Sequence, residues 1–452
     1  MKQPSRHLLA IVAAATFVHT ALLIVVRART GAVDTYAFQS IDAREYHTIA
    51  ANLVDHAAFS QNPAPPLRPD TWRTPGYPFF LAGLMLIVGK SPAALLVAQQ
   101  LLGVLSAALL FAIAARHISP RRATVVTLLF LLEPYHVYYS LWLMSTTLQT
   151  TLILAIWLAL DRGAKPLWAG LLCAALVLTW PGALFVPIAA FAFLMTRAWH
   201  QHRTQSHDVW AIPVKFVWIC GIATSTWMFR NAVVAGAFAL SDQSGIVLAY
   251  FKATEVVLWS EGRTADRYLE TSLDSRQLDH SHRVWDSIDL RLFDHHYDKP
   301  EVNWRNLAQG NRTDADSFVL SSELALIAVE MMLDLPLSTL GCGLTRIAQI
   351  LTFPLDLGLA PPNGVTINRA RSALVGGVYT LLAGWVMFRL IRHRSALVSA
   401  GFPLLCTLAL LLAATPQTDP RFRVPMIPML LLLAFVPTRR ATNFHPAENL
   451  SS

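Results

Sequence analysis

Residues 72–78 read Trp72-Arg73-Thr74-Pro75-Gly76-Tyr77-Pro78, and they close a polar, aromatic-rich stretch that starts at Asp42. The stretch follows one hydrophobic run and precedes a long series of others. Within a bilayer, ionised side chains and irregular backbone are stable only with partners. We therefore expect residues 42–78 to form a working surface outside the lipid.

The composition is typical of a polytopic membrane protein. Of the 452 residues, 54% are hydrophobic and 14% are charged, and the mean hydropathy is +0.44. One soluble core does not need so much apolar surface. The net charge is +8, but the arginines stand between hydrophobic runs, where the positive-inside rule places them. We therefore expect contact with membrane lipid and none with nucleic acid.

Apolar runs for about ten membrane helices follow one another along the chain, since a helix needs about 20 such residues, and fewer where proline interrupts it. They cover residues 8–27, 92–115, 122–133, 137–160, 166–180, 182–198, 209–229, 369–390, 396–414 and 423–437. Basic residues concentrate in the segments that an inside N-terminus places in the cytosol. The predicted fold is an all-α polytopic bundle of about ten (8–12) transmembrane helices with both ends inside.

Two long segments are left outside the membrane, residues 28–91 and residues 231–368. Between residues 241 and 316 the second segment holds 14 of the 28 acidic residues of the chain, which is the composition of a water-exposed domain. From Glu323 to Phe353 an apolar pattern returns. It indicates amphipathic or interfacial helices, with a re-entrant pair or two further spans as alternatives.

The predicted organisation has four parts, with the catalytic chemistry in the first external segment. The parts are a membrane module over 1–230 that includes 28–91, an extracytoplasmic domain over 231–368, membrane helices over 369–437 and a cytoplasmic tail over 438–452.

Asp42 stands at the start of a predicted amphipathic helix, because apolar or aromatic residues follow at three-four spacing from Tyr46 to Val54. A carboxylate at this place can cap the free backbone amides of the first turn and interact with the helix dipole. It can equally act as a general base or a metal ligand in a cavity at the membrane surface. The residues alone leave both interpretations open.

Four sequence blocks carry a resemblance to a known family. They are Asp42-Ala-x-x-Tyr46-x-x-Ile49-Ala50-x-Asn52-Leu53, Arg73-Thr74-Pro75-Gly76-Tyr77-Pro78, Trp227-Met-Phe-Arg230-Asn231 with Gly236-Ala-Phe238, and Asp419-Pro420-Arg421-Phe422-Arg423-Val424-Pro425-Met426-Ile427-Pro428. Together they resemble the GT-C glycosyltransferases, in the bacterial branch related to protein O-mannosyltransferases and the aminoarabinose transferase of lipid A. The resemblance covers roughly residues 5–437.

This resemblance implies an enzyme of the bacterial inner membrane that takes a sugar from a polyprenyl-phosphate carrier. The sugar would pass to a lipid, glycan or protein acceptor at the periplasmic face. Asp42 falls on the family's external acidic position, where the carboxylate is thought to deprotonate the acceptor hydroxyl or to hold a divalent metal. A base is needed because a hydroxyl is a poor nucleophile until its proton is removed.

The chain departs from the family at a second acidic position. Many relatives carry an acid near the start of the fourth span, where this chain has Thr146. Glu133 lies at the same expected boundary and is the candidate to replace it, although a solvated loop acid is the simpler interpretation. The departure bears on metal dependence more than on the transfer itself.

Phosphate binding is expected from arginine, because its planar fork pairs with two phosphate oxygens and keeps its charge. Four arginines lie at expected external ends of apolar runs, namely Arg73, Arg230, Arg421 and Arg423. Tyr46 and Tyr77 belong to the same blocks and are further candidates for substrate contact. Snorkelling to lipid phosphates and an aromatic membrane belt are the structural alternatives.

Two hypotheses from other classes compete with the enzyme: a transporter or flippase of lipid-linked saccharides, and an inactive scaffold for envelope assembly. The sequence has no ATPase phosphate-binding loop and no inverted repeat. It also has few ionisable residues in the middle of apolar runs, where transporters place coupling charges. Loss of sugar transfer on replacing Asp42 would favour the enzyme over both.

Overall fold

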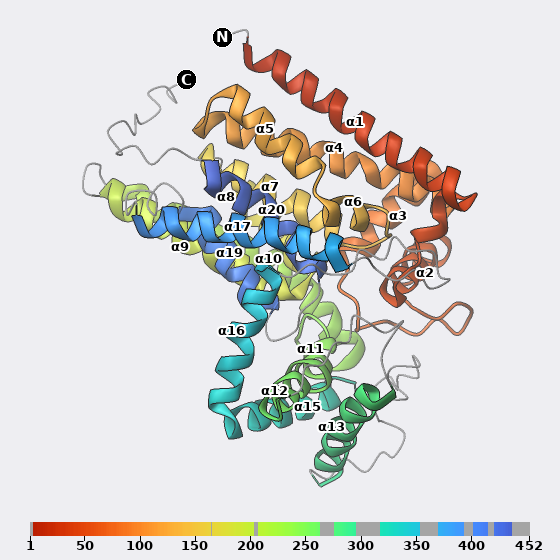
Figure 1. Cartoon of the computed structure of the whole chain (residues 1–452). Coiled ribbons are helices and arrows are strands. Elements are labelled where there is room, and N and C mark those ends of the chain that lie inside the picture. Colours follow the sequence, from red (N-terminus) through yellow and green to blue (C-terminus); the bar gives the residue numbers. More distant parts are fainter. Residues whose placement is uncertain are drawn as a thin grey trace.

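The computed structural model describes residues 3–163, 165–202, 207–262, 275–294, 317–352, 369–392, 401–414 and 420–435. Within these ranges all regular secondary structure is helical, which confirms the predicted all-α class. Figure 1 shows long helices lying side by side in a bundle, with α11, α12, α13 and α15 standing below it.

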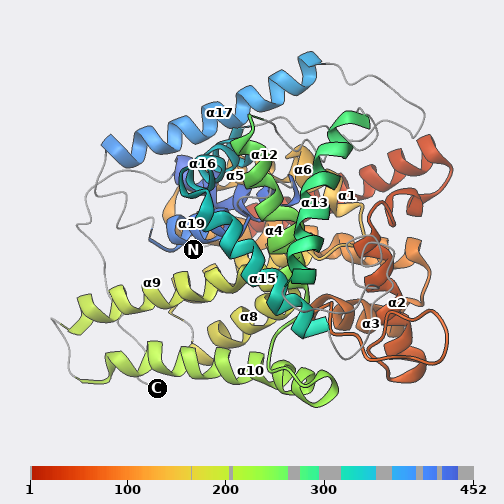
Figure 2. The same cartoon turned by 90° about the horizontal axis from the view of Figure 1, so that it is seen from below.

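The N-terminal part of the bundle places two short helices between its first two long ones. Its elements are α1 (Gln3–Thr30), η1 (Val33–Tyr36), α2 (Ile41–His56), α3 (Gly76–Val88), α4 (Pro92–His117), α5 (Pro120–Leu131), α6 (Pro134–Ser140), α7 (Thr146–Asp161), α8 (Pro166–Thr179), η2 (Pro181–Leu184), α9 (Phe185–His202), η3 (His207–Trp210) and α10 (Ala211–Ala235). In both views α2 and α3 lie at one end of the bundle (Figures 1 and 2).

The remaining helices first form the group that stands below the bundle in Figure 1 and then return to the bundle. They are α11 (Gln243–Ile246), the π-helix η4 (Val247–Ala253), α12 (Thr254–Ser260), α13 (Ser275–Asp294), α15 (Ser317–Asp334), α16 (Pro336–Thr352), α17 (Arg369–Arg392), α19 (Gly401–Ala414), the 3-10 helix η6 (Pro420–Met426) and α20 (Ile427–Phe435). Buried residues of α11, η4, α12, α13 and α15 form a hydrophobic cluster separate from that of the bundle.

Four described helical stretches are long and apolar enough to cross a membrane, namely Arg6–Thr30, Pro92–His117, Pro181–Trp199 and Ala211–Ala235. Shorter apolar helices accompany them, namely Gly76–Val88, Thr146–Asp161, Pro166–Thr179, Gly401–Ala414 and Arg423–Phe435. Every predicted apolar run coincides with helix in the described residues, but the run 137–160 is not one helix. The predicted number of spans stays a prediction.

The run 137–160 divides into α6 and α7 because distant groups bind the backbone of the break between them. Leu143 N donates to Ala37 O at 3.1 Å. Two buried glutamines of α4 donate hydrogen bonds to backbone carbonyls at the break. Gln99 Nε2 donates to Trp142 O at 2.7 Å, and Gln100 Nε2 donates to Ser140 O at 2.8 Å. Backbone groups without an intrahelical partner are thereby satisfied.

The ends of the bundle that the positive-inside rule assigns to the cytosol lie together. Arg116 at the end of α4 forms an ion pair with Asp161 at the end of α7. Arg197 of α9 donates to Leu160 O of the same α7 end at 3.1 Å. The ends of α4, α7 and α9 that the sequence predicts to share one side of the membrane therefore lie close together.

Candidate functional site

Asp42 does not cap α2, because Ser40 does. Ser40 has an extended backbone, and its side chain accepts from Asp42 N at 3.2 Å. A serine at this position satisfies one of the free amides of the first turn. The interpretation of Asp42 as a helix cap is therefore wrong, and its carboxylate is available for other partners.

Both oxygens of the Asp42 carboxylate accept from arginines that are remote in the chain. Arg73 Nη2 donates to Oδ1 at 2.5 Å, and Arg421 Nη1 donates to Oδ2 at 2.8 Å. The Asp42 side chain keeps 22% of its surface exposed. The structure thus joins the segment between α1 and α4 to η6 at one carboxylate.

Arg73 is held by a second acid on the same helix face. Glu45 lies one turn after Asp42, and its Oε2 accepts from Arg73 Nε at 2.6 Å. The Arg73 guanidinium lies 5.0 Å from the centroid of the Tyr46 ring, at cation–π distance. Tyr46 in turn meets the edge of Tyr77, which is fully buried and donates to Gln99 Oε1 at 2.5 Å. Tyr77 therefore packs against Tyr46 in the interior and does not face a substrate.

The two arginines decide the protonation state of Asp42. Burial by itself would raise the pKa of the carboxyl, but the charges of Arg73 and Arg421 outweigh it. They hold the pKa of Asp42 well below its usual range. The carboxylate is ionised at every physiological pH.

A divalent metal at Asp42, which the resemblance implies, does not fit this arrangement. Both carboxylate oxygens already accept from guanidinium groups. A cation would have to displace an arginine and would meet two positive charges at close range. In the part of the chain that the structure describes, no three His, Cys, Asp or Glu side chains gather as a metal group.

The loop that carries Arg73 is fixed from two sides. Asp70 Oδ2 accepts from Arg73 N at 2.8 Å, and Asp70 O accepts from Arg230 Nη1 at 2.6 Å. Thr71 Oγ1 donates to Asp242 Oδ2 at 2.9 Å. Arg230 lies on α10 and Asp242 precedes α11, so both elements help to position Arg73.

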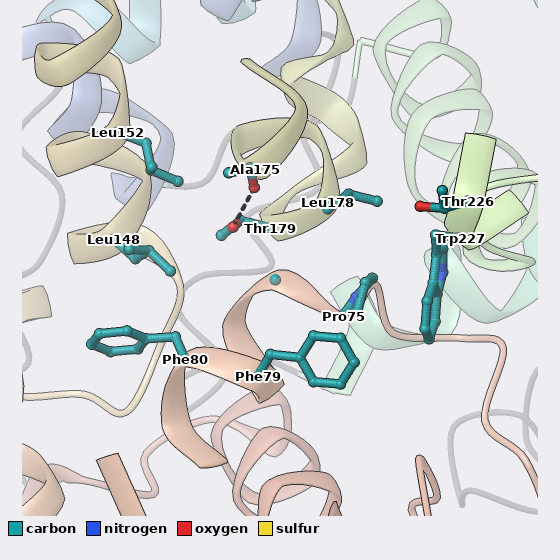
Figure 3. Close-up of a pocket in the computed structure, with 11 residues that line it drawn as sticks. Pro75, Phe79, Phe80, Leu148, Leu152, Ala175, Leu178, Thr179, Thr226 and Trp227 are labelled. Carbon is teal, nitrogen blue, oxygen red and sulfur yellow. Dashed lines mark hydrogen bonds between the residues drawn. The ribbon is translucent and has the colours of Figure 1, made fainter. Parts of the chain in front are cut away.

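An apolar hollow of about 350 Å³ lies beside this loop, between α3, α7, α8 and α10. Figure 3 shows Pro75 and Phe79 on one side of it and Leu178 with Trp227 on the others. The Arg230 guanidinium lies 4.8 Å from the Trp227 ring centroid. A charged group thus stands at the edge of an apolar space, an arrangement that suits an amphiphile with an anionic head.

Glu133 is buried, with 6% of its surface exposed, so the interpretation as a solvated loop acid is wrong. Its carboxylate caps α6 by accepting from Tyr135 N at 3.1 Å and His136 N at 2.5 Å. The hydroxyl of Tyr379 in α17 also donates to it. The structure therefore uses Glu133 to join α6 and α17.

Arg423 packs against the same cluster and is 1% exposed. Its guanidinium lies 5.1 Å from the Tyr135 centroid and 4.5 Å from the Tyr379 centroid, and its Nε donates to Ile350 O. Arg423 thereby fastens η6, the element that carries Arg421. It anchors the phosphate-binding candidate next to it and is not itself open to a lipid headgroup.

Glu133→Gln is expected to flatten part of the pH dependence of thermal stability. Burial raises the pKa of Glu133, which lies in the turn between α5 and α6, to about 7. A raised carboxyl pKa contributes stability below the unfolded pKa, and this contribution is lost as pH rises through the folded one. Between pH 5 and 8 the wild type should lose about 3 kcal/mol at this site, and the glutamine variant should not.

The measurement is Tm in lipid nanodiscs at both pH values. Glu261→Gln is the control, because Glu261 pairs with Arg283 at the protein surface. Equal pH dependence of wild type and Glu133→Gln would contradict the assignment.

Sequence reasoning missed three acids that build the site. Glu45 could have been found, because it follows Asp42 by one helical turn and shares its face. Asp70 precedes Arg73 by three residues, a spacing that suits a side chain that accepts from the backbone. Asp242 had no local signal, because its partner Thr71 is 171 residues away.

Comparison with known proteins gives one family match and two structural likenesses. Residues 72–228 match the family described as dolichyl-phosphate-mannose-protein mannosyltransferase. The crystal structure of ArnT from Cupriavidus metallidurans bound to undecaprenyl phosphate aligns with 94% of this chain and 77% of its own, at 14% identity and a TM-score of 0.41. The apo structure of the same protein aligns with 94% and 76%, at 14% identity and 0.39. Among curated proteins none matches.

The family match covers Arg73, Tyr77 and every wall of the hollow through Trp227. That family comprises mannosyltransferases that use dolichyl-phosphate-linked mannose. The resemblance of this chain to GT-C membrane glycosyltransferases is thereby confirmed over residues 72–228.

Proposed function

We propose that the protein is a membrane glycosyltransferase that moves a sugar from a polyprenyl-phosphate donor to an acceptor at the outer face of a bacterial inner membrane. The observation that carries this proposal is the Asp42 carboxylate held between Arg73 and Arg421, with an apolar hollow lined by Pro75 and Gly76, which follow Arg73 in the chain. The family match supports it. The acceptor is a hydroxyl of a lipid, a glycan or a protein.

Asp42 serves as the general base in this reaction. It removes the proton from the acceptor hydroxyl while the hydroxyl oxygen bonds to the anomeric carbon of the sugar. The bond from that carbon to the carrier phosphate breaks, and the phosphate leaves with the electron pair. Attack from the side opposite the phosphate inverts the configuration. No step needs a metal.

The arginines bind the phosphate of the donor, and the hollow binds the start of its lipid chain. Arg421 and Arg230 are partly exposed, and their forks can each pair with two phosphate oxygens. The apolar hollow accommodates the first isoprene units, so that the remainder of the chain stays in the bilayer. Remote binding energy from the lipid then fixes the sugar beside Asp42.

The direct test follows the label from the donor lipid. The purified full-length protein is incubated in lipid with a panel of radiolabelled polyprenyl-phosphate sugars and an envelope lipid extract as acceptor. Label should leave the polyprenyl-phosphate fraction for at least one sugar. Retention of all label with every sugar in the panel would overturn the proposal.

Thr226→Trp is expected to weaken binding of a long-chain donor about tenfold or more. Thr226 lines the hollow, and an indole there would fill the space that the isoprene units need. Each buried CH₂ contributes about 0.8 kcal/mol, so loss of a few of them produces this effect. The readout is the KM for a polyprenyl donor. The KM for a donor with a ten-carbon chain should rise as well, because that chain is made of the first isoprene units that the hollow accommodates.

The matched control is Ile222→Trp, one turn earlier on α10. Ile222 is 61% exposed and does not line the hollow. If both tryptophan variants raised KM equally for both donors, the hollow would not be the chain site.

A further inference from the structure

The two arginines that bind Asp42 are held very differently. Arg73 has 6% of its side chain exposed and binds Glu45 as well as Asp42. Its backbone amide donates a hydrogen bond to the Asp70 carboxylate. Its guanidinium also lies over the Tyr46 ring. A ligand that took Arg73 away would leave two partly buried carboxylates without their shared cation. Arg73 is therefore a fixed partner.

Arg421 is the outer partner. Its side chain is 26% exposed, and it reaches Asp42 from η6, 379 positions along the chain. An anion that arrives from solvent or from the membrane surface meets this guanidinium before it meets Arg73. A phosphate competes well for it, because it offers more negative charge than a carboxylate and matches the guanidinium fork.

In the structure Asp42 is poorly suited to remove a proton. Two charge-assisted hydrogen bonds stabilise the carboxylate, and such bonds favour the ionised form over the protonated one. A general base is most effective when its pKa lies near the working pH, and that of Asp42 lies far below. Loss of one arginine would increase its basicity.

We propose that Arg421 is an exchangeable partner that passes from Asp42 to the donor phosphate. The inference rests on the proposed function and adds its regulation. With no donor bound, the hydrogen bond from Arg421 keeps the basicity of the Asp42 carboxylate low. The donor phosphate takes the Arg421 guanidinium, Asp42 keeps Arg73 alone, and its free oxygen then accepts the proton of the acceptor hydroxyl. After transfer the polyprenyl phosphate leaves and Arg421 returns to Asp42.

This exchange makes a prediction that a simple catalytic role does not make. Asp42 and the phosphate compete for one arginine, so removal of the Asp42 charge should improve binding of the lipid phosphate. We expect undecaprenyl phosphate, used as the probe, to bind Asp42→Asn about tenfold more tightly than wild type. The protein is the full chain in nanodiscs, and affinity is measured by titration at fixed salt.

Two comparisons separate exchange from a general effect of charge. Glu45→Gln removes a carboxylate from the same cluster, but Glu45 binds Arg73, so its affinity should stay within about twofold of wild type. In an Arg421→Met background, Asp42→Asn should give no improvement. Arg421→Lys keeps the positive charge but loses the planar fork. If Arg421→Lys binds undecaprenyl phosphate with intermediate affinity, the loss of binding in Arg421→Met comes from the lost guanidinium and not from loss of folding.

The outcomes distinguish this inference from the proposed function. Binding to wild type with no tightening in Asp42→Asn would overturn the exchange and leave the glycosyltransferase standing. Equal tightening in Glu45→Gln, or tightening that persists without Arg421, would also overturn it. No binding of undecaprenyl phosphate to wild type would overturn the proposed function itself.

Discussion

Asp42→Asn is expected to lower the rate of sugar transfer by about a hundred- to ten-thousandfold, the range that a general base contributes. The amide preserves the size of the side chain and one oxygen acceptor. It cannot take a proton from the acceptor hydroxyl. Because Arg73 retains Glu45 as a partner, the variant should remain folded. The measurement is kcat for release of label from the polyprenyl-phosphate donor.

Asp55→Asn is the matched control, since Asp55 stands on the same helix α2. Its side chain is 43% exposed and pairs with Lys90 at the surface, away from the arginine pair. Transfer by this variant should equal that of wild type within about twofold, because surface ion pairs contribute little. Full transfer activity in Asp42→Asn would remove Asp42 from the chemistry, and another group would then have to take the proton of the acceptor hydroxyl.

The sequence was sufficient for the long helices of the bundle and for the choice of Asp42 and the arginine blocks as candidate site residues. Apolar runs and proline positions located the long helices of the bundle, because membrane helices depend on local composition. They did not predict α3, an apolar helix in a segment expected outside the membrane, or the helices from α11 to α13. The shared order of the blocks pointed to Asp42, Arg73 and Arg421 together. Their contact itself needed the structure, because Arg421 lies 379 positions from Asp42.

What the sequence could not show depends on distant partners. Glu133 looked like a loop acid because its hydrogen-bond donor Tyr379 lies 246 positions away. The end of α6 could not be predicted from the sequence for the same reason. Gln99 and Gln100 of α4, which lie far away in the chain, donate to backbone carbonyls at and just after this end. Tyr77 and Arg423 were predicted to contact the substrate, but the structure places both side chains in the interior. Side-chain direction at a membrane boundary cannot be read from spacing alone.

Arg73→Met is expected to damage both stability and activity. Methionine keeps the apolar packing against Tyr46 but leaves Asp42 and Glu45 one helical turn apart without the cation they share. Removal of one member of a buried ionic cluster costs about 3 kcal/mol or more. Lys90→Met is the control: it breaks the surface pair with Asp55 and should cost less than about 1 kcal/mol.

The double variant Arg73→Met with Glu45→Gln separates the two kinds of damage. Neutralising Glu45 removes the repulsion between the two carboxylates, so about 1–2 kcal/mol of the lost stability should return in a double-mutant cycle. Activity should not return, because Asp42 would still lack the arginine that orients its carboxylate toward the acceptor. If transfer recovered together with Tm, Arg73 would be only a structural counterion, and the fixed half of the Asp42 site would have no part in the reaction.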